Sequence, residues 1–147
     1  MTDVEPKTRL DRLVQVRERG EDSALENLAR AQSSLGRASE RLAGLRQAAR
    51  SDDRAFGSAE LWVVVEAAHA RTLNEVRGAE RDLAQASQRV GVARDGYGAA
   101  HRDAEVARRA QEKKRSEIRT DRERREQKAL DELATLRFNV REPKTGT

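Results

Sequence analysis

The sequence contains no cysteine and few aromatic residues or prolines. The absence of cysteine excludes disulfides, thiolate metal ligands and a thiol nucleophile. Two phenylalanines, one tryptophan and one tyrosine among 147 residues are too few to fill a thick globular core. The two prolines, Pro6 and Pro143, lie near the ends, so residues 7–142 contain no ring that would break a helix. Very long helices are therefore permitted.

Long apolar runs are also missing. The longest apolar cluster is LWVVV at residues 61–65, well short of the ~18 residues that a membrane span requires. The opening residues, MTDVEPKTRLDRL, lack the apolar core of a signal peptide. We therefore expect a cytoplasmic protein that meets a membrane only through its partners.

Signatures of catalysis and cofactor binding are missing as well. His69 and His101 are far apart in sequence, and the GYG at residues 96–98 is not followed by the pattern of a phosphate-binding loop. The adjacent carboxylates Asp131 and Glu132 would point about 100° apart on a helix, with no base or nucleophile beside them. We expect no catalytic residue, metal site, cofactor or small-molecule substrate, and therefore a protein that is not an enzyme.

Charge dominates what the sequence does contain. Charged residues make up 38% of the chain, and alanine, leucine, glutamate and arginine are abundant, a mixture typical of coiled coils. From Leu10 to Phe56, positions taken alternately four and three residues apart are apolar in eleven of fourteen cases. This repeat of 3.5 residues predicts a coiled-coil seam on a first helix, at about residues 8–55. Thr8, with Asp11 three residues later, marks the start of that helix.

A second seam starts at Trp62 and is apolar at twelve of its fourteen positions. It predicts a second helix at about residues 58–138, followed by a flexible tail at 139–147. Between the two seams, Gly57 interrupts the pattern and predicts a turn at about residues 52–58.

The two seams together predict the fold class. It is all-α, a long antiparallel two-helix coiled-coil hairpin that forms one domain and has an overhanging C-terminal helix. Folding at the turn would place Leu28 near residue 86 and Leu42 near residue 72. With this register, residues beyond about 108 have no partner within the chain.

Three glycines, at positions 91, 96 and 98, weaken the second helix. Each costs about 1 kcal/mol relative to alanine inside a helix. A turn at Asp95-Gly96 would give three shorter helices instead of two. The seam stays in phase across the glycines, however, and this favours one continuous helix.

The overhanging part is strongly charged and then turns apolar. The stretch RTDRERREQK at residues 119–128 is charged at eight of its ten positions, and residues 111–147 carry eleven basic and eight acidic side chains. Leucines and Phe138 follow at residues 130–138, where nothing in the chain would cover them. An uncovered apolar stripe at the end of a helix predicts a protein partner.

These C-terminal residues carry a resemblance to a known family. The ending EQKALDELATLRF resembles the C-terminal signature of the FliJ/YscO family, the central stalk proteins of flagellar and injectisome type III secretion. The similarity lies in the charged helix and in Lys128, Asp131, Glu132 and Ala134 after it. The opening RLDRLVQVRERGEDSALENLARAQ, the chain length and the two-helix plan are similar too.

The resemblance implies a function. Family members are non-enzymatic stalks that insert their terminal end into a hexameric secretion ATPase, link it to a membrane export-gate protein, and promote ATPase activity and protein export. They also engage export chaperones. The resemblance implies that Lys128, Asp131, Glu132 and Ala134 belong to the ATPase-facing end. The charged stretch and the apolar stripe add further residues to the predicted ATPase contact: Arg122, Arg124, Arg125, Leu130, Leu133 and Phe138. It implies that the hairpin facing the export gate includes Phe56, Leu61, Trp62 and Val65.

Several alternatives stay open from the residues alone. The chain could be a generic coiled-coil adaptor or a nucleic-acid-associated helical protein. Lys113 to Arg115 and Arg122 to Arg125 could bind phosphates, but intermixed acids and the lack of stacking aromatics disfavour nucleic acid as a partner. Trp62 could pack locally against Phe56 and the first helix rather than contact a partner. The sequence does not distinguish a flagellar from an injectisome system.

Overall fold

The computed structural model describes residues 4–50 and 58–141 and contains two helices in these ranges. Helix α1 spans Asp11–Arg50 and helix α2 spans Ala59–Arg141. The described residues contain no strand, so the predicted all-α fold with two long helices is confirmed. The predicted turn, apart from Ser58, and Phe56 within it lie outside the described residues, as do residues 142–147 of the predicted tail. Residues 139–141, also predicted as tail, belong to α2.

Both helices begin at polar caps that the sequence provides. The Thr8 hydroxyl donates to Asp11 Oδ1 at 2.7 Å, and the Thr8 backbone N–H donates to Asp11 Oδ2 at 3.0 Å. The Asp11 carboxylate thus satisfies the Thr8 N–H, as in one half of a capping box, while the Asp11 N–H donates to the Thr8 backbone oxygen at 3.3 Å. At the start of α2, the Leu61 N–H donates to Ser58 Oγ at 3.4 Å, and Glu60 adds a negative charge to the first turn.

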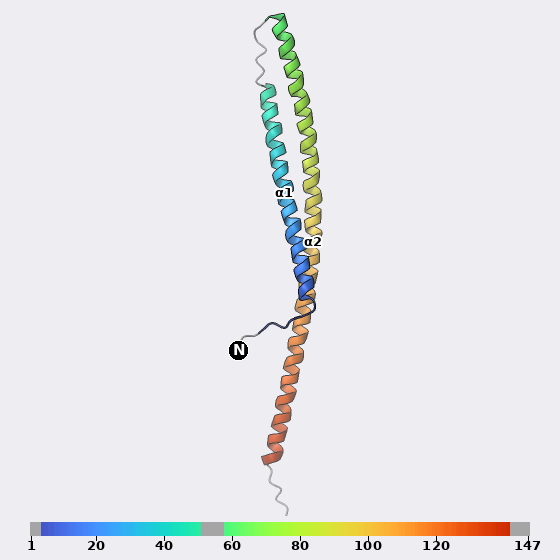
Figure 1. Ribbon diagram of the computed structural model, residues 1–147. Helices are drawn as coiled ribbons and strands as arrows, with labels where there is room; N and C mark the ends of the chain where they lie inside the picture. The colour runs from blue at the N-terminus through green and yellow to red at the C-terminus, as the bar shows by residue number, and fades with distance from the viewer. Residues whose placement is uncertain (1–3, 51–57, 142–147) are drawn as a thin grey trace, which may run out of the picture. The chain divides into compact units, whose positions relative to one another are not determined.

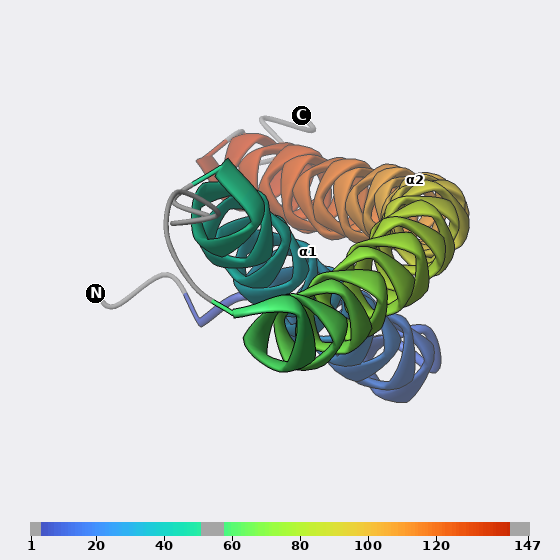
Figure 2. The same ribbon diagram turned by 90° about the horizontal axis from the view of Figure 1, so that it is seen from above.

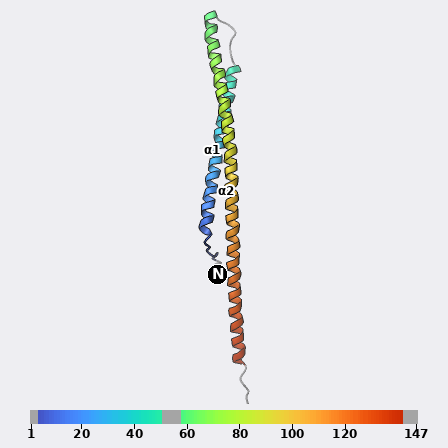
Figure 3. The same ribbon diagram turned by 90° about the vertical axis from the view of Figure 1, so that its right-hand side faces the viewer.

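The described chain packs as two units, and each combines parts of both helices. One unit is Arg19–Arg102, and the other joins residues up to Glu18 with those from Asp103 onward. Within Arg19–Arg102, α1 and α2 lie side by side and run antiparallel (Figures 1 and 3). Figure 2 views this pair from the end at which α2 begins, with the first turns of α2 nearest the viewer.

The predicted seam is the buried face of both helices. In Arg19–Arg102, every α1 seam position from Glu21 to Ala49 and every α2 seam position from Val65 to Ala100 is half-buried or buried. The most enclosed side chains there are Leu42, Ala79, Ala86 and Val90. In the other unit, Val14, Ala104 and Ala107 are buried. The 3.5-residue repeat therefore identified the packing face correctly.

The register predicted from the sequence is wrong. Arg41 pairs with Asp82 at 3.6 Å and Arg46 pairs with Glu80 at 3.0 Å, so Leu42 lies near residue 81 rather than near residue 72. A seam that repeats every seven residues fits several registers equally well. The prediction assumed that pairing began directly at the turn, whereas interhelical ion pairs select a register further along α2.

Helix α2 is continuous through its glycines, so the alternative break at Asp95-Gly96 is wrong. A Cβ added at Gly91 or Gly96 would meet nothing within 4 Å. These glycines therefore do not serve a close approach of the backbones. Burial of the neighbouring seam residues, such as Val90, offsets the ~1 kcal/mol that each glycine costs.

The register can be tested with introduced cysteines, because the chain has none of its own. We expect Arg41→Cys combined with Asp82→Cys to be joined by a short bismaleimide within one chain. The matched pair Leu42→Cys with Thr72→Cys should stay unlinked under the same conditions. Mass spectrometry of tryptic peptides measures both yields. Efficient linkage of the second pair alone would restore the register predicted from the sequence.

The seam should respond to truncation of Leu42, which is 4% exposed. We expect Leu42→Ala to lower the free energy of unfolding by about 2 kcal/mol, near the low end for leucine truncation because a two-helix seam lies close to solvent. Leu25→Ala is the control, since Leu25 is 49% exposed and should change stability little. Urea unfolding followed by circular dichroism measures both. Equal losses for the two variants would contradict the assignment of the seam.

Candidate partner-binding site on the C-terminal helix

The uncovered part of α2 begins later than predicted. Arg108 Nε donates to Glu18 Oε1 at 3.1 Å, and Gln111 Nε2 donates to Asp11 Oδ1 at 2.8 Å. Ile118 is half-buried, whereas every residue from Arg119 to Val140 is exposed. The overhang predicted from about residue 108 therefore starts at about residue 119. The seam becomes polar at Gln111, but Gln111 and Arg115 pair there with Asp11, so this part of α2 is still in contact with the start of α1.

Residues 4–10, here named the N-terminal arm, account for this extension. Pro6 of the arm is buried, and Glu5 forms an ion pair with Arg115 of α2. Arg115 also pairs with Asp11 at 3.5 Å, so one guanidinium meets two carboxylates. The contact between the arm and α2 was not predicted, because residues 4–10 show neither a helical nor a strand repeat of apolar residues. The one available signal was a glutamate next to a proline, Glu5 and Pro6, in a chain with a basic tail.

The Asp11 carboxylate contacts three residues: Thr8, Gln111 and Arg115. Hydrogen bonds from the Thr8 hydroxyl and the Thr8 backbone N–H, then from Gln111, lower the pKa of Asp11 from 3.8 to about 2. The positive charge of Arg115 lowers it further. Each of these groups favours the ionised carboxylate. Asp11 therefore joins the start of α1, the arm and α2 at one point.

Beyond the arm, α2 presents a dense row of charges. Arg119 pairs with Glu112 along the helix, and Lys114 pairs with Glu117 at 3.0 Å, which lowers the pKa of Glu117. Four basic residues of the predicted site are exposed and form no ion pair with any part of the chain that the structure describes: Arg122, Arg124, Arg125 and Lys128. Exposed, solvated cations of this kind can exchange partners at little cost.

The end of α2, residues 129–140, is here named the tip. Its leucines and Phe138 are each between 58% and 69% exposed. Leu133, Leu136 and Val140 follow one another at steps of three and four, and together with Arg137 they line a shallow surface pocket. Leu136 and Val140 were absent from the predicted site, whose apolar members were Leu130, Leu133, Ala134 and Phe138.

The opposite side of the tip is polar. Gln127 Nε2 donates to Asp131 Oδ1 at 3.1 Å, and the Thr135 hydroxyl donates to the Asp131 backbone oxygen at 2.8 Å. Helical geometry places Glu132 on the same polar side, beside the Leu133 stripe. The tip is thus amphipathic, and all of its described side chains face solvent.

Comparison with known proteins gives one family match. A family model described as Flagellar FliJ protein matches residues 6–143, nearly the whole chain. The chain belongs to the FliJ family. No curated protein and no solved structure gives a significant match. Membership associates the chain with the flagellar export apparatus and supports the flagellar rather than the injectisome branch of the resemblance.

Two findings describe what this FliJ-family chain does not offer in its described residues. Within residues 4–50 and 58–141, no helix is long and apolar enough to cross a membrane. The same residues contain no group of three or more histidine, aspartate or glutamate side chains that could hold a metal ion.

The predicted gate-facing residues lie at the start of α2. Leu61 is 50% exposed and Trp62 is 48% exposed, while Val65 is half-buried in the seam. Val63 and Val64, which the prediction left out, are more exposed than either. The start of α2 therefore carries a second cluster of exposed apolar side chains in the FliJ-family chain.

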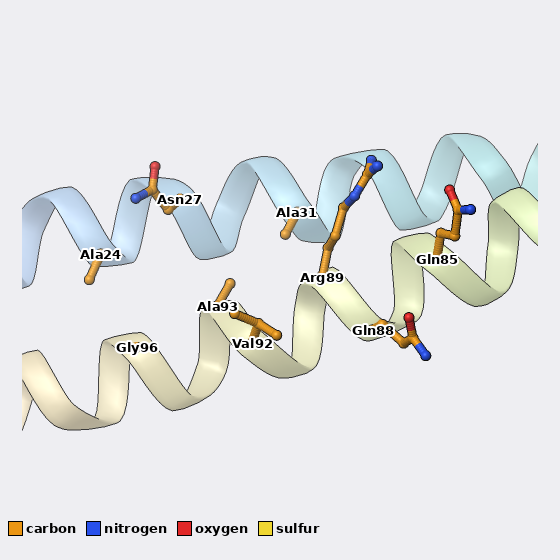
Figure 4. A pocket seen from close by; sticks show the side chains of 9 residues that line it. All are labelled: Ala24, Asn27, Ala31, Gln85, Gln88, Arg89, Val92, Ala93 and Gly96. Carbon is orange, nitrogen blue, oxygen red and sulfur yellow. The ribbon is translucent and has the colours of Figure 1, made fainter.

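The unit Arg19–Arg102 also carries a shallow groove between α1 and α2 (Figure 4). Alanine side chains of the seam are too short to fill the space between the helices there. Among the described residues that line it, Arg89 alone is charged, and Figure 4 shows its side chain reaching toward α1. The lining residues are Ala24, Asn27, Ala31, Gln85, Gln88, Arg89, Val92, Ala93 and Gly96.

The lowered pKa of Asp11 gives a prediction for acid conditions. Because the folded pKa lies below the unfolded one, Asp11 stabilises the folded state above about pH 4, and this contribution is lost as the pH falls toward 2. We expect the backbone N–H resonance of Thr8 to titrate with an apparent pKa of about 2. Asp11→Asn should remove that titration. A midpoint near 4 in the intact chain would contradict the three hydrogen bonds to Asp11.

Proposed function

We propose that this FliJ-family chain is the non-enzymatic central stalk of the flagellar export ATPase complex. The observation that carries the proposal is the uninterrupted exposure of α2 from Arg119 to Val140, which ends in an amphipathic tip. The family match over residues 6–143 supports the same assignment. The terminal end would enter the hexameric ATPase, promote its activity and thereby promote protein export.

The tip supplies the specific part of this contact. Leu133, Leu136 and Val140 form a stripe that a groove in the ATPase could remove from water. Full burial contributes about 1.5–3 kcal/mol for each side chain of this size. Glu132, beside the stripe, would pair with a basic group of the ring. The predicted contact therefore gains Leu136 and Val140 in addition to its original members.

The charged segment from Arg119 to Lys128 supplies weaker contacts. Its exposed cations interact with acidic groups through water and are screened by salt beyond about 10 Å at 0.1 M. Several such contacts guide association and can be exchanged between identical subunits of a ring. A stalk that acts on successive subunits needs this exchange. A deeply buried apolar contact with one subunit would prevent it.

The start of α2 is the proposed contact with the membrane export gate. Leu61, Trp62, Val63 and Val64 expose apolar surface there, next to the capped first turn. An exposed tryptophan among valines is typical of the centre of a protein interface. Export chaperones belong to the proposal through the family resemblance, with no surface assigned to them.

The tip can be tested by comparing two double variants. We expect Leu133→Ser with Leu136→Ser to reduce stimulation of the cognate flagellar ATPase at least tenfold, because the apolar stripe is lost. Thr135→Ser with Asn139→Ser changes the polar side of the same turns and should keep full stimulation. ATP turnover measured across a range of stalk concentrations gives both values.

Deletion of residues 129–147 gives the limiting case. The truncated chain should keep the melting behaviour of the helix pair, measured by circular dichroism, because every tip residue is exposed. It should lose stimulation entirely. A folded, truncated chain that stimulates the ATPase as well as the full chain would show that the tip is not the contact.

A further inference from the structure

The N-terminal arm occupies a surface of α2 that the proposed ATPase contact at the tip does not use. Glu5 pairs with Arg115, and Pro6 is buried. Val4, Glu5 and Pro6 also share a surface cleft with residues about one to three turns beyond Arg115 on α2. These residues are Arg119, Arg122, Glu123 and Glu126. The arm is not helical before residue 9, so α2 here binds an irregular segment with a carboxylate next to a proline.

The contacts that hold the arm differ in strength. Asp11 is fixed by Thr8, Gln111 and Arg115 and belongs to the first turn of α1. Glu5 is 69% exposed, and within the described residues Arg115 is its one ion-pair partner. An exposed ion pair contributes about 0–1 kcal/mol. The part of the arm around Glu5 can therefore leave while Asp11 stays in place.

Arg115 is suited to accept a replacement carboxylate. Its side chain is 21% exposed, so its charge is less screened than that of the cations further along α2. Its Nε is buried and forms no hydrogen bond with any described residue, so Glu5 and Asp11 do not use all of its donors. If Glu5 leaves, Asp11 still neutralises the guanidinium, and the helix pair keeps its end contact.

The neighbouring side chains define what the surface recognises. Ile118 is half-buried and lies one turn beyond Arg115, and exposed cations follow at Arg119 and Arg122. On a helix, positions three, four and seven apart share one face. An apolar side chain between cations fits an extended segment in which a carboxylate adjoins a small apolar residue or a proline.

We propose that the face of α2 formed by Arg115, Ile118, Arg119 and Arg122 is a docking surface for an extended acidic segment of a partner protein. The N-terminal arm fills this surface as an internal stand-in for that segment. A partner binds by displacing Glu5 and Pro6 while Asp11 continues to hold Arg115. This contact lies outside the tip, although it shares Arg119 and Arg122 with the charged segment proposed to contact the ATPase. Peptide binding in the absence of the ATPase therefore tests it separately.

The test uses the arm itself as an external probe. An acetylated peptide of residues 1–8, MTDVEPKT, is titrated into the isotope-labelled chain lacking residues 1–7, and the Ile118 methyl and arginine side-chain resonances are followed. We expect saturable shifts, with at least fivefold tighter binding than to the intact chain, whose own arm competes. The same peptide with glutamine in place of Glu5 should bind at least fivefold more weakly.

If the chain lacking residues 1–7 does not fold, variants of the full-length chain test the same proposal. Glu5→Gln should release the arm and let the peptide bind at least fivefold more tightly than it binds the unaltered chain. Glu5→Gln combined with Arg115→Gln should abolish binding. Glu26→Gln is the control, because Glu26 is exposed and pairs with Arg30 within α1, and it should change nothing. Absence of saturable shifts at millimolar peptide in the shortened and Glu5→Gln chains, or equal binding after loss of Arg115, would overturn the proposal.

Discussion

Two helices on their own can bury only one stripe of each helix, and the rest of this structure follows from that limit. The fully enclosed side chains are mostly small: Ala79, Ala86, Ala104 and Ala107 are each 5% exposed or less. Larger seam residues such as Leu28 and Leu35 stay half-buried, because a pair of helices leaves both edges of the seam open to water. Stability must therefore accumulate along a long seam rather than in a thick core, which explains the scarcity of aromatic residues.

Where the seam loses its apolar residues, pairs of polar or charged side chains replace them. Glu21, at a seam position, meets His101 Nδ1 at 2.9 Å, and Tyr97 stacks on the His101 ring at a centroid distance of 5.9 Å. Further toward the N-terminus, Arg17 meets Asp103 at 3.4 Å. Exposed pairs of this kind contribute about 0–1 kcal/mol each, less than a buried leucine. They fix which residues face one another, but they bind the chain ends only weakly.

The sequence predicted those features that depend on local pattern. The buried stripe follows from the 3.5-residue period, and the start of α1 follows from the spacing of Thr8 and Asp11. The register did not follow, because a seam of near-identical alanine and leucine layers fits itself after a shift of one heptad. The pairing of Glu5 with Arg115 joins residues far apart in sequence, and no period in residues 4–10 announces it.

In the candidate site, too, some features were predictable from the sequence and others were not. The exposed tip was predictable because α2 is much longer than α1, but the row of apolar residues that a partner would cover was not, since Leu130 and Leu133 belong to two different helical rows. The row through Leu133 includes Leu136 and Val140, and the row through Leu130 includes Ala134 and Phe138. A partner that covers one row leaves part of the other exposed. The choice between the rows depends on the shape of the partner, which the isolated helix does not determine.

The tip cannot account for a stable complex without help from other surfaces. Burying Leu133, Leu136 and Val140 would contribute about 5–9 kcal/mol. Association of two proteins costs about 4–15 kcal/mol in lost freedom of motion, so little or nothing of the tip contribution is left. Further contacts made by the same chain add without repeating that cost. The free cations of the charged segment and the face beneath the N-terminal arm lie on the same helix and can supply them. In the stalk role proposed above, several weak surfaces would together bind firmly, while each surface could still be released separately.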